Sequence, residues 1–383
     1  MAEVVALKSA HRLELLAEGA AFDVAAPDVP PVAPVRFGAR PGMVFEAAAG
    51  GRCLPIFKVL LSNQCRNDCH YCALRSSANV PRAGFTTEEL VDTFLALLRG
   101  GRVQGMFLSS AVCGSAERTQ ERMLQVVEVL RHRHHYRGYI HLKLLPGVSD
   151  AAIEASLRLA DRLSVNLEAP SVAHLARIAP DKAFRRELLA PLERAAAMAG
   201  PGILRSGLTT QFVVGGAGET DREVLGAGDW LYRKLGLRRA YYSGFHPLPD
   251  TPLEGMPAAS ALRQHRLYQA DFLLRHYDVG LPELVFSPEG GLSTAHDPKL
   301  AMALAAADRY PLEINRATKE ELLRVPGLGP VSVERILGCR RERQIRDARQ
   351  LAKLGVRRQA LGFLTLAGRY QGPDAGQLRL ALG

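Results

Sequence analysis

Three cysteines lie close together in the sequence and could bind a metal centre. Cys65, Cys69 and Cys72 have the spacing C-x3-C-x2-C, and the aromatic residue Tyr71 stands directly before the last of them. Thiolates are soft ligands that suit iron–sulfur clusters and zinc. A structural zinc site wants four ligands, whereas a four-iron cluster held by three cysteines keeps one iron open. The alternatives are a zinc site and three buried cysteines without a ligand.

The elements that must position these cysteines alternate between strand and helix. An apolar run at 56–61 predicts a buried strand that ends just before them. Further strands are predicted at 104–109, 139–144, 162–168, 208–214 and 240–243, with helical segments between them. Thr86 and Glu89 form the pattern of a capping box, and one helical pattern runs over 171–198. Six such units predict a parallel sheet with right-handed crossovers.

Active sites of parallel β/α barrels lie at the C-terminal ends of the strands. Polar residues and glycines at the predicted strand ends are therefore candidates for the site. They are Ser109, Ser110, Lys143, Asn166, Glu168, Gly215 and Gly216. Lys143 lies in an otherwise apolar strand and could hold a carboxylate or a phosphate; the alternative is a lysine that reaches water from the strand end.

Composition bounds the class of protein. The chain has 383 residues, 47% of them hydrophobic and 23% charged, which is ordinary for a globular protein. No apolar run is long enough for a membrane helix, no signal peptide is visible, and the six cysteines include one cluster of three, so we expect a cytoplasmic protein. We expect an N-terminal extension at 1–50, a barrel at 51–250, a connecting segment at 251–312 and a small all-α domain at 313–383.

The last 71 residues carry much of the net charge of +10 and a second motif. They hold 14 Lys and Arg against 7 Asp and Glu, an excess of 7 positive charges, which favours binding to a polyanion. Two helical patterns flank a glycine turn, which resembles the helix-hairpin-helix motif, whose backbone N–H groups point at a phosphate. The residues expected at a nucleic acid are Gly327, Leu328, Gly329, Val331 and Arg335. The alternative is a helical hairpin that docks onto a protein.

The cysteine stretch resembles the motif of radical S-adenosylmethionine (SAM) enzymes, including its aromatic residue. The resemblance implies a partial (β/α)6 barrel of the TIM type, a [4Fe–4S] cluster on the three cysteines, and SAM bound at the open iron. Ser109 and Ser110 stand where many relatives have Gly-Gly-Glu, and Asn166 or Glu168 suits a ribose hydroxyl. The implied SAM contacts are Tyr71, Ser109, Ser110, Lys143, Asn166, Glu168, Gly215 and Gly216.

Nearly the whole chain resembles a radical SAM family assigned to DNA modification or repair, on residues 53–60, 107–110, 138–143, 160–166, 210–215, 241–243, 265–271, 297–299 and 324–327. The resemblance implies reductive cleavage of SAM to a 5′-deoxyadenosyl radical that acts on DNA. The alternatives are an enzyme that modifies RNA, such as tRNA, and a nucleic-acid sensor with a structural cluster. The implied partners are DNA in preference to RNA, a uracil-DNA-glycosylase-like protein, and an electron donor such as flavodoxin or ferredoxin.

Overall fold

The computed structural model describes residues 2–20, 44–49, 52–200 and 202–372. The chain divides into two compact units. The first comprises residues 1–219 and 230–264, and the second comprises residues 220–229 and 265–383. Each unit is described by itself.

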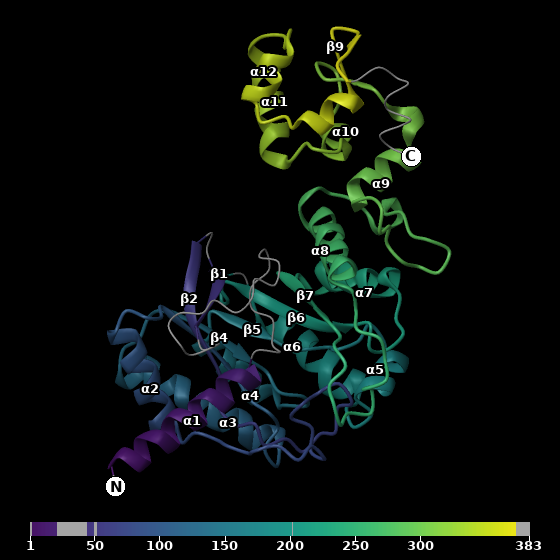
Figure 1. Ribbon diagram of the computed structural model, residues 1–383. Helices are drawn as coiled ribbons and strands as arrows, with labels where there is room; N and C mark the ends of the chain where they lie inside the picture. The colour runs from purple at the N-terminus through teal and green to yellow at the C-terminus, as the bar shows by residue number, and fades with distance from the viewer. Residues whose placement is uncertain (1, 21–43, 50–51, 201, 373–383) are drawn as a thin grey trace. The chain divides into compact units, whose positions relative to one another are not determined.

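The first unit is built on a curled seven-stranded sheet whose strands follow in chain order (Figure 1). The strands are β1 (Val44–Ala49), β2 (Arg52–Leu60), β3 (Gly105–Ser109), β4 (Tyr139–Lys143), β5 (Arg162–Ser164), β6 (Gly207–Val214) and β7 (Arg239–Gly244). Strands β2 to β7 are parallel, and β1 pairs antiparallel with β2. The predicted α/β architecture with a parallel half-barrel sheet is confirmed.

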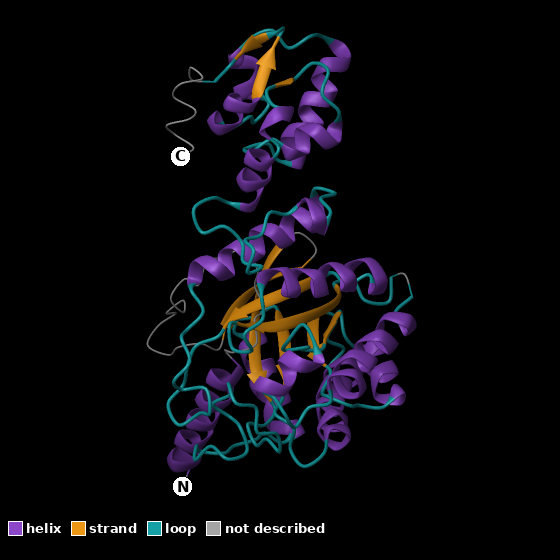
Figure 2. Ribbon diagram, turned by 90° about the vertical axis from the view of Figure 1, so that its right-hand side faces the viewer, coloured by secondary structure: helices purple, strands orange, loops and turns teal. Residues whose placement is uncertain are grey.

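Helices flank this sheet (Figure 2). They are α1 (Ala2–Ala20), α2 (Thr87–Arg99), α3 (Ala116–Glu128) with its π-helical continuation η1 (Val129–Arg133), α4 (Asp150–Leu159), α5 (Val172–Ile178), the π-helix η2 (Phe184–Leu189), α6 (Ala190–Met198) and the later part of α7 (Asp221–Leu235). The capping box predicted before α2 is present, because Thr86 and Glu89 exchange both hydrogen bonds.

The core of this unit lies on both faces of the sheet, as expected for parallel strands covered by helices. All five residues of β3 are buried. Ile56, Phe107 and Tyr139 form a buried cluster against which Phe45 and Leu54 pack. The strands are thereby fixed in register, and their C-terminal ends meet at one edge.

The structure differs from the sequence predictions in three places within this unit. Strand β1 was not predicted. The helix predicted over 171–198 is interrupted between α5 and η2, because Pro180 has no N–H and its ring clashes with the preceding turn. Strand β5 ends at Ser164, so Asn166 and Glu168 lie beyond the strand and not on it, and Glu168 has a positive φ of 65° that ends the extended conformation.

The second unit contains the later part of α8 (Ala261–His276), η3 (Leu281–Glu283), α9 (Pro298–Ala305), η4 (Ala307–Arg309), α10 (Lys319–Arg324), α11 (Pro330–Glu342), α12 (Ala348–Lys353) and η5 (Arg358–Phe363). It also contains a small sheet of β8 (Leu312–Glu313), β9 (Leu364–Leu366) and β10 (Arg369–Tyr370). The prediction of an all-α domain is therefore wrong. Ala367 and Gly368 both have positive φ, which permits a two-residue hairpin between β9 and β10.

None of the described helices combines the length and the apolar character needed to span a bilayer.

Candidate iron–sulfur site and its surroundings

The three cysteines lie on the loop after β2, and all three line one pocket of the first unit. Cys69 is buried, and Cys65 and Cys72 are partly exposed. Six of the eight predicted SAM contacts line the same pocket. They are Tyr71, Ser109, Ser110, Lys143, Asn166 and Glu168. Residues from four separate stretches of sequence thus converge where the strand-end rule placed them.

The two predicted glycines lie elsewhere. Gly215 and Gly216 follow β6 but do not line this pocket. The Gly215 amide donates to the Glu219 carboxylate, and its φ of 98° suits glycine. A side chain at Gly216 would come within 3.1 Å of the Phe245 ring. These glycines therefore shape the turn after β6.

Main-chain hydrogen bonds fix the cysteine loop internally. The Cys72 amide donates to the Cys69 carbonyl at 3.0 Å, and the Arg66 amide donates to the Val112 carbonyl at 2.9 Å. The Leu74 amide donates to the Cys72 sulfur at 3.4 Å. The loop conformation therefore does not depend on the cysteine side chains alone.

A single arginine holds the loop from its downstream side. The Arg82 guanidinium donates to four main-chain carbonyls, at distances between 2.6 and 2.9 Å. The acceptors belong to residues 63, 74, 75 and 78, which lie on both sides of the three cysteines. Charge-assisted hydrogen bonds are stronger than neutral ones, so Arg82 ties together the two ends of the cysteine loop.

The segment 177–182, which we call the clasp, holds the loop from the other side. The His70 amide donates to the Ile178 carbonyl at 2.8 Å, and His70 Nδ1 lies 3.1 Å from the Arg177 carbonyl. The Asp68 amide donates to the Asp181 carboxylate at 2.7 Å. Arg177 and Ile178 are the last two residues of α5, and the final carbonyls of a helix have no partner within it, so the helix end before Pro180 leaves them available to the cysteine loop.

The clasp also brings a lysine into the pocket that the sequence analysis missed. Lys182 Nζ lies 3.0 Å from Glu168 Oε1, and both side chains are nearly buried. Lys182 donates to the Glu168 carboxylate, and its charge acts on the Cys69 thiol. Burial and the charge of Glu168 raise the pKa of Tyr71. The available signal was the rarity of lysine in this chain together with the proline two residues before.

Burial controls the protonation of the thiols. It raises the pKa of Cys72 to about 12, and the neighbouring Cys69 adds to the effect. Burial likewise raises the pKa of Cys69, against the opposing charge of Lys182. Thiol ligands must lose their protons to bind metal, so loading of this site releases protons and depends on pH.

The donor set fits a cluster held by three cysteines. Three sulfurs from one loop face one pocket, and a buried cation lies beside one of them. Among the described residues, no three His, Cys, Asp or Glu side chains are arranged to hold a single metal ion. A four-iron cluster does not require three side chains to converge on one metal ion, because each cysteine would bind a different iron.

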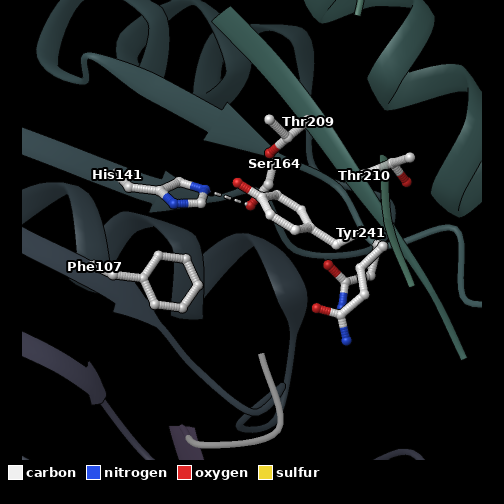
Figure 3. Close-up of a pocket in the computed structure, with 8 residues that line it drawn as sticks. Phe107, His141, Ser164, Thr209, Thr210 and Tyr241 are labelled. Atoms are coloured by element: carbon white, nitrogen blue, oxygen red, sulfur yellow. Dashed lines mark hydrogen bonds between the residues drawn. The ribbon is translucent and has the colours of Figure 1, made fainter. Parts of the chain in front are cut away.

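The barrel interior next to this pocket is polar. His141 Nε2 lies 2.8 Å from the Ser164 hydroxyl (Figure 3). Burial lowers the pKa of His141 well below its usual value, and the nearby cations Arg162, Lys143 and Lys58 lower it further. His141 is therefore neutral. Asn166 and Gln211 line both this interior space and the cysteine pocket.

The second unit contains the hairpin predicted to meet a nucleic acid. Helix α10 ends at Arg324, and α11 begins at Pro330. Gly327 has a φ of 82°, which the turn requires. Leu328 is buried, whereas Val331 is 65% exposed. Gly329 is the N-cap residue of α11 and has no side chain, so no side-chain hydrogen bond from it caps the helix.

A second turn packs against the first. The Ser332 hydroxyl donates to the Gly355 carbonyl at 2.9 Å. A side chain at Gly327 would lie 3.4 Å from Arg357 Cβ. Arg335 and Arg357 are both exposed. The two turns therefore place exposed arginines on neighbouring stretches of the same unit.

A buried lysine of α9 contacts the turn between α10 and α11. The Lys299 ammonium donates to the Leu328 carbonyl and lies 4.5 Å from the centre of the Tyr277 ring. Burial lowers the pKa of Lys299 to about 7. Lys299 therefore links α9 to the turn.

Comparison with known proteins defines the class of the first unit. Residues 59–231 match the family model described as the radical SAM superfamily. This stretch is a radical SAM domain, which marks the chain as an enzyme. Enzymes of this superfamily use a [4Fe–4S] cluster and SAM, which confirms both predicted cofactors. None of the curated proteins matches the chain.

Solved structures of radical SAM proteins resemble part of the chain. The [FeFe]-hydrogenase maturase HydG from Carboxydothermus hydrogenoformans is 17% identical over 56% of this chain and 50% of its own, with a TM-score of 0.46. Methylornithine synthase is 15% identical over 56% and 60%, with a TM-score of 0.46. The methyltransferase TsrM from Kitasatospora setae is 15% identical over 51% and 38%, with a TM-score of 0.40. The chain spans about half the length of the first structures it matches.

Proposed function

We propose that this protein cleaves SAM reductively at a [4Fe–4S] cluster on Cys65, Cys69 and Cys72 and uses the resulting 5′-deoxyadenosyl radical to modify or repair DNA. The bound cluster and SAM supply the radical chemistry, and the protein orients them. The support for the first part is the convergence of three thiols and six polar or aromatic residues in one pocket of a radical SAM domain.

Within that pocket the residues divide into two roles. The cysteine loop, held by Arg82 and the clasp, presents the three sulfurs. Ser109 and Ser110, at the end of β3, and Lys143, at the end of β4, lie on the strand-end side. These strand-end groups would hold the polar groups of SAM. Buried polar groups in such a pocket need partners, and SAM offers several.

The observation that carries the nucleic-acid part is the hairpin between α10 and α11. Its turn leads into an uncapped helix N-terminus, and exposed arginines flank it on two neighbouring turns. Such contacts position a phosphate backbone without reading its sequence. An enzyme that acts on a base takes that base out of the stack, so a backbone grip of this kind would supply part of the binding energy.

The radical chemistry is tested by anaerobic reconstitution of the full chain with iron and sulfide. With dithionite and SAM we expect 5′-deoxyadenosine, and the triple variant Cys65→Ala, Cys69→Ala, Cys72→Ala should form none. A native chain that binds iron through these cysteines and yet forms no 5′-deoxyadenosine would contradict the proposal and favour the sensor.

The nucleic-acid part is tested by competition binding of duplex DNA, single-stranded DNA and RNA at matched salt, because affinity depends steeply on salt. Each of Arg335→Ala and Arg357→Ala should lower the slope of log affinity against log salt by about 1. Arg158→Ala removes an exposed arginine of the first unit and serves as control. Unchanged binding in both hairpin variants would refute this role, and stronger binding of RNA would favour an RNA substrate.

The proposal extends to location and to two protein partners. A cytoplasmic location suits free thiols, which need a reducing compartment. Flavodoxin or ferredoxin would deliver the electron, which anaerobic reduction of the loaded protein tests directly. A uracil-DNA-glycosylase-like protein would act on the same DNA, and co-purification from cells tests that association.

A further inference from the structure

Lys182 is a buried cation that lies against a cysteine sulfur of the site. Its side chain is 10% exposed, it donates to Glu168 at 3.0 Å, and it lines the same pocket as Cys69, on whose thiol its charge acts. Neither the family match nor the strand-end rule gives this residue a role. Its position in the clasp, two residues after the helix-breaking Pro180, places it next to the cysteine loop.

Glu168 is a rigid anchor for this lysine. The Glu168 amide donates to the Gln211 carbonyl at 2.9 Å, and the Val213 amide donates to the Glu168 carbonyl at 2.7 Å. The backbone of Glu168 is therefore tied to β6 on both sides of its Cα. Because the anchor is fixed and buried, Lys182 has little freedom to swing away from Cys69.

The charge state of Lys182 follows from its neighbours. Its ammonium pairs with the Glu168 carboxylate at 3.0 Å, and both side chains are nearly buried. A buried ion pair with a good hydrogen bond keeps both charges, since the loss of either would leave the other unpaired. Lys182 is thus a permanent cation at neutral pH.

We propose that Lys182 sets the reduction potential of the cluster by donating a hydrogen bond to the Cys69 thiolate, while Glu168 holds the lysine in place and partly offsets its charge. Hydrogen bonds to cluster sulfurs and the local charge are the means by which proteins tune such potentials. One electron from a low-potential donor makes the cluster more negative, and a nearby ammonium stabilises the reduced form. Lys182 itself exchanges no proton and forms no covalent bond.

The test is an anaerobic redox titration of the reconstituted full chain, with dithionite as reductant and the electron paramagnetic resonance signal of the reduced cluster as readout, first without SAM. Lys182→Met should shift the midpoint potential to more negative values. Glu168→Gln, which keeps the lysine but removes the offsetting charge, should shift it to more positive values. A merely structural role would not produce shifts of opposite sign.

Lys143→Met is the matched control. Lys143 lines the same pocket from the end of β4, whereas Lys182 is the lysine whose charge acts on both Cys69 and Cys72. Its substitution should move the SAM-free potential less than Lys182→Met does. Because no nucleic acid is present and no turnover is measured, the result does not depend on the substrate proposed above.

Three outcomes would overturn the inference. The first is an unchanged potential in a Lys182→Met protein that retains its iron. The second is a shift that occurs only with SAM present, which would place the lysine at the SAM carboxylate. The third concerns the case in which Lys182→Met takes up no iron and its potential cannot be measured. Glu168→Gln then provides the test, and a midpoint potential in that variant that does not shift to more positive values would refute the role of Lys182.

Discussion

Substitution of Arg82 should lower the free energy of local opening of the cysteine loop. The effect should be larger than for the other arginines near the loop. Arg82→Met keeps the length of the aliphatic chain and deletes four hydrogen bonds to main-chain carbonyls. At about 1 kcal/mol net for each bond, the loss is about 4 kcal/mol. Since water can reach some of these carbonyls once the loop relaxes, we expect a loss of about 2–4 kcal/mol in the local opening free energy.

The assay is native-state hydrogen exchange on the full chain, combined with the iron-to-protein ratio after reconstitution. Two amides inside the loop report directly, since Ser76 donates to Asn67 and Ala78 donates to Arg75. A loss of about 2–4 kcal/mol corresponds to exchange faster by between about 30-fold and about 1,000-fold. Iron retention should fall in parallel, because the two ends of the loop no longer stay together.

Arg122→Met is the control for this prediction. Arg122 makes one hydrogen bond to a main-chain carbonyl, that of Phe85, at 2.9 Å. Its removal should cost about 1 kcal/mol and leave the cysteine loop protected. If Arg82→Met lost no more protection at Ser76 and Ala78 than Arg122→Met, the reasoning about the shared guanidinium would be refuted.

Three further predictions concern stability. Lys299 has a pKa of about 7 in the folded chain, below its ordinary value of 10.5. At pH values between these two pKa values the unfolded state binds more protons than the folded state. The second unit should therefore become more stable as pH rises from 7 toward 10. Thermal midpoints at pH 7 and 9 should show this rise, and Lys299→Met should abolish it. Gly327→Ala should lower the free energy of unfolding by about 1–2 kcal/mol because of the positive φ. The control Gly338→Ala lies inside α11 with open space around it and should raise the free energy of unfolding by up to about 1 kcal/mol. Equal effects of the two substitutions in denaturant melts would contradict the turn assignment. Thr86→Ala should lose about 1 kcal/mol with the capping box before α2, and an unchanged melt would show that this cap contributes nothing.

The chemistry of the site could be predicted because it is local in sequence. Three cysteines within eight residues define the cluster ligands whatever surrounds them. The strand-end rule then found Ser109 and Lys143, since parallel strands bring their C-terminal ends to one edge. It did not find Lys182, which lies after a helix, at a break whose direction depends on packing against the cysteine loop.

The parallel strands of the fold were predictable from the sequence, and the short or edge strands were not. The parallel strands have clear apolar runs, but β1 lies in a segment with ordinary composition and gains its conformation by pairing with β2. The short strands β8 and β10 have two residues each and leave almost no pattern. Such elements are decided by tertiary partners, which local propensity does not encode.

The clasp has a consequence for how this protein would respond to mutagenesis. Two of its contacts to His70 are made by the carbonyls of Arg177 and Ile178, which every amino acid possesses. An alanine scan would leave both acceptors in place and would pass over positions that support the metal centre. Deleting Ala179 or Pro180 would change the spacing between these carbonyls and the Asp181 carboxylate, which accepts from Asp68 in the same loop, so deletions would be far less tolerated in this stretch than substitutions.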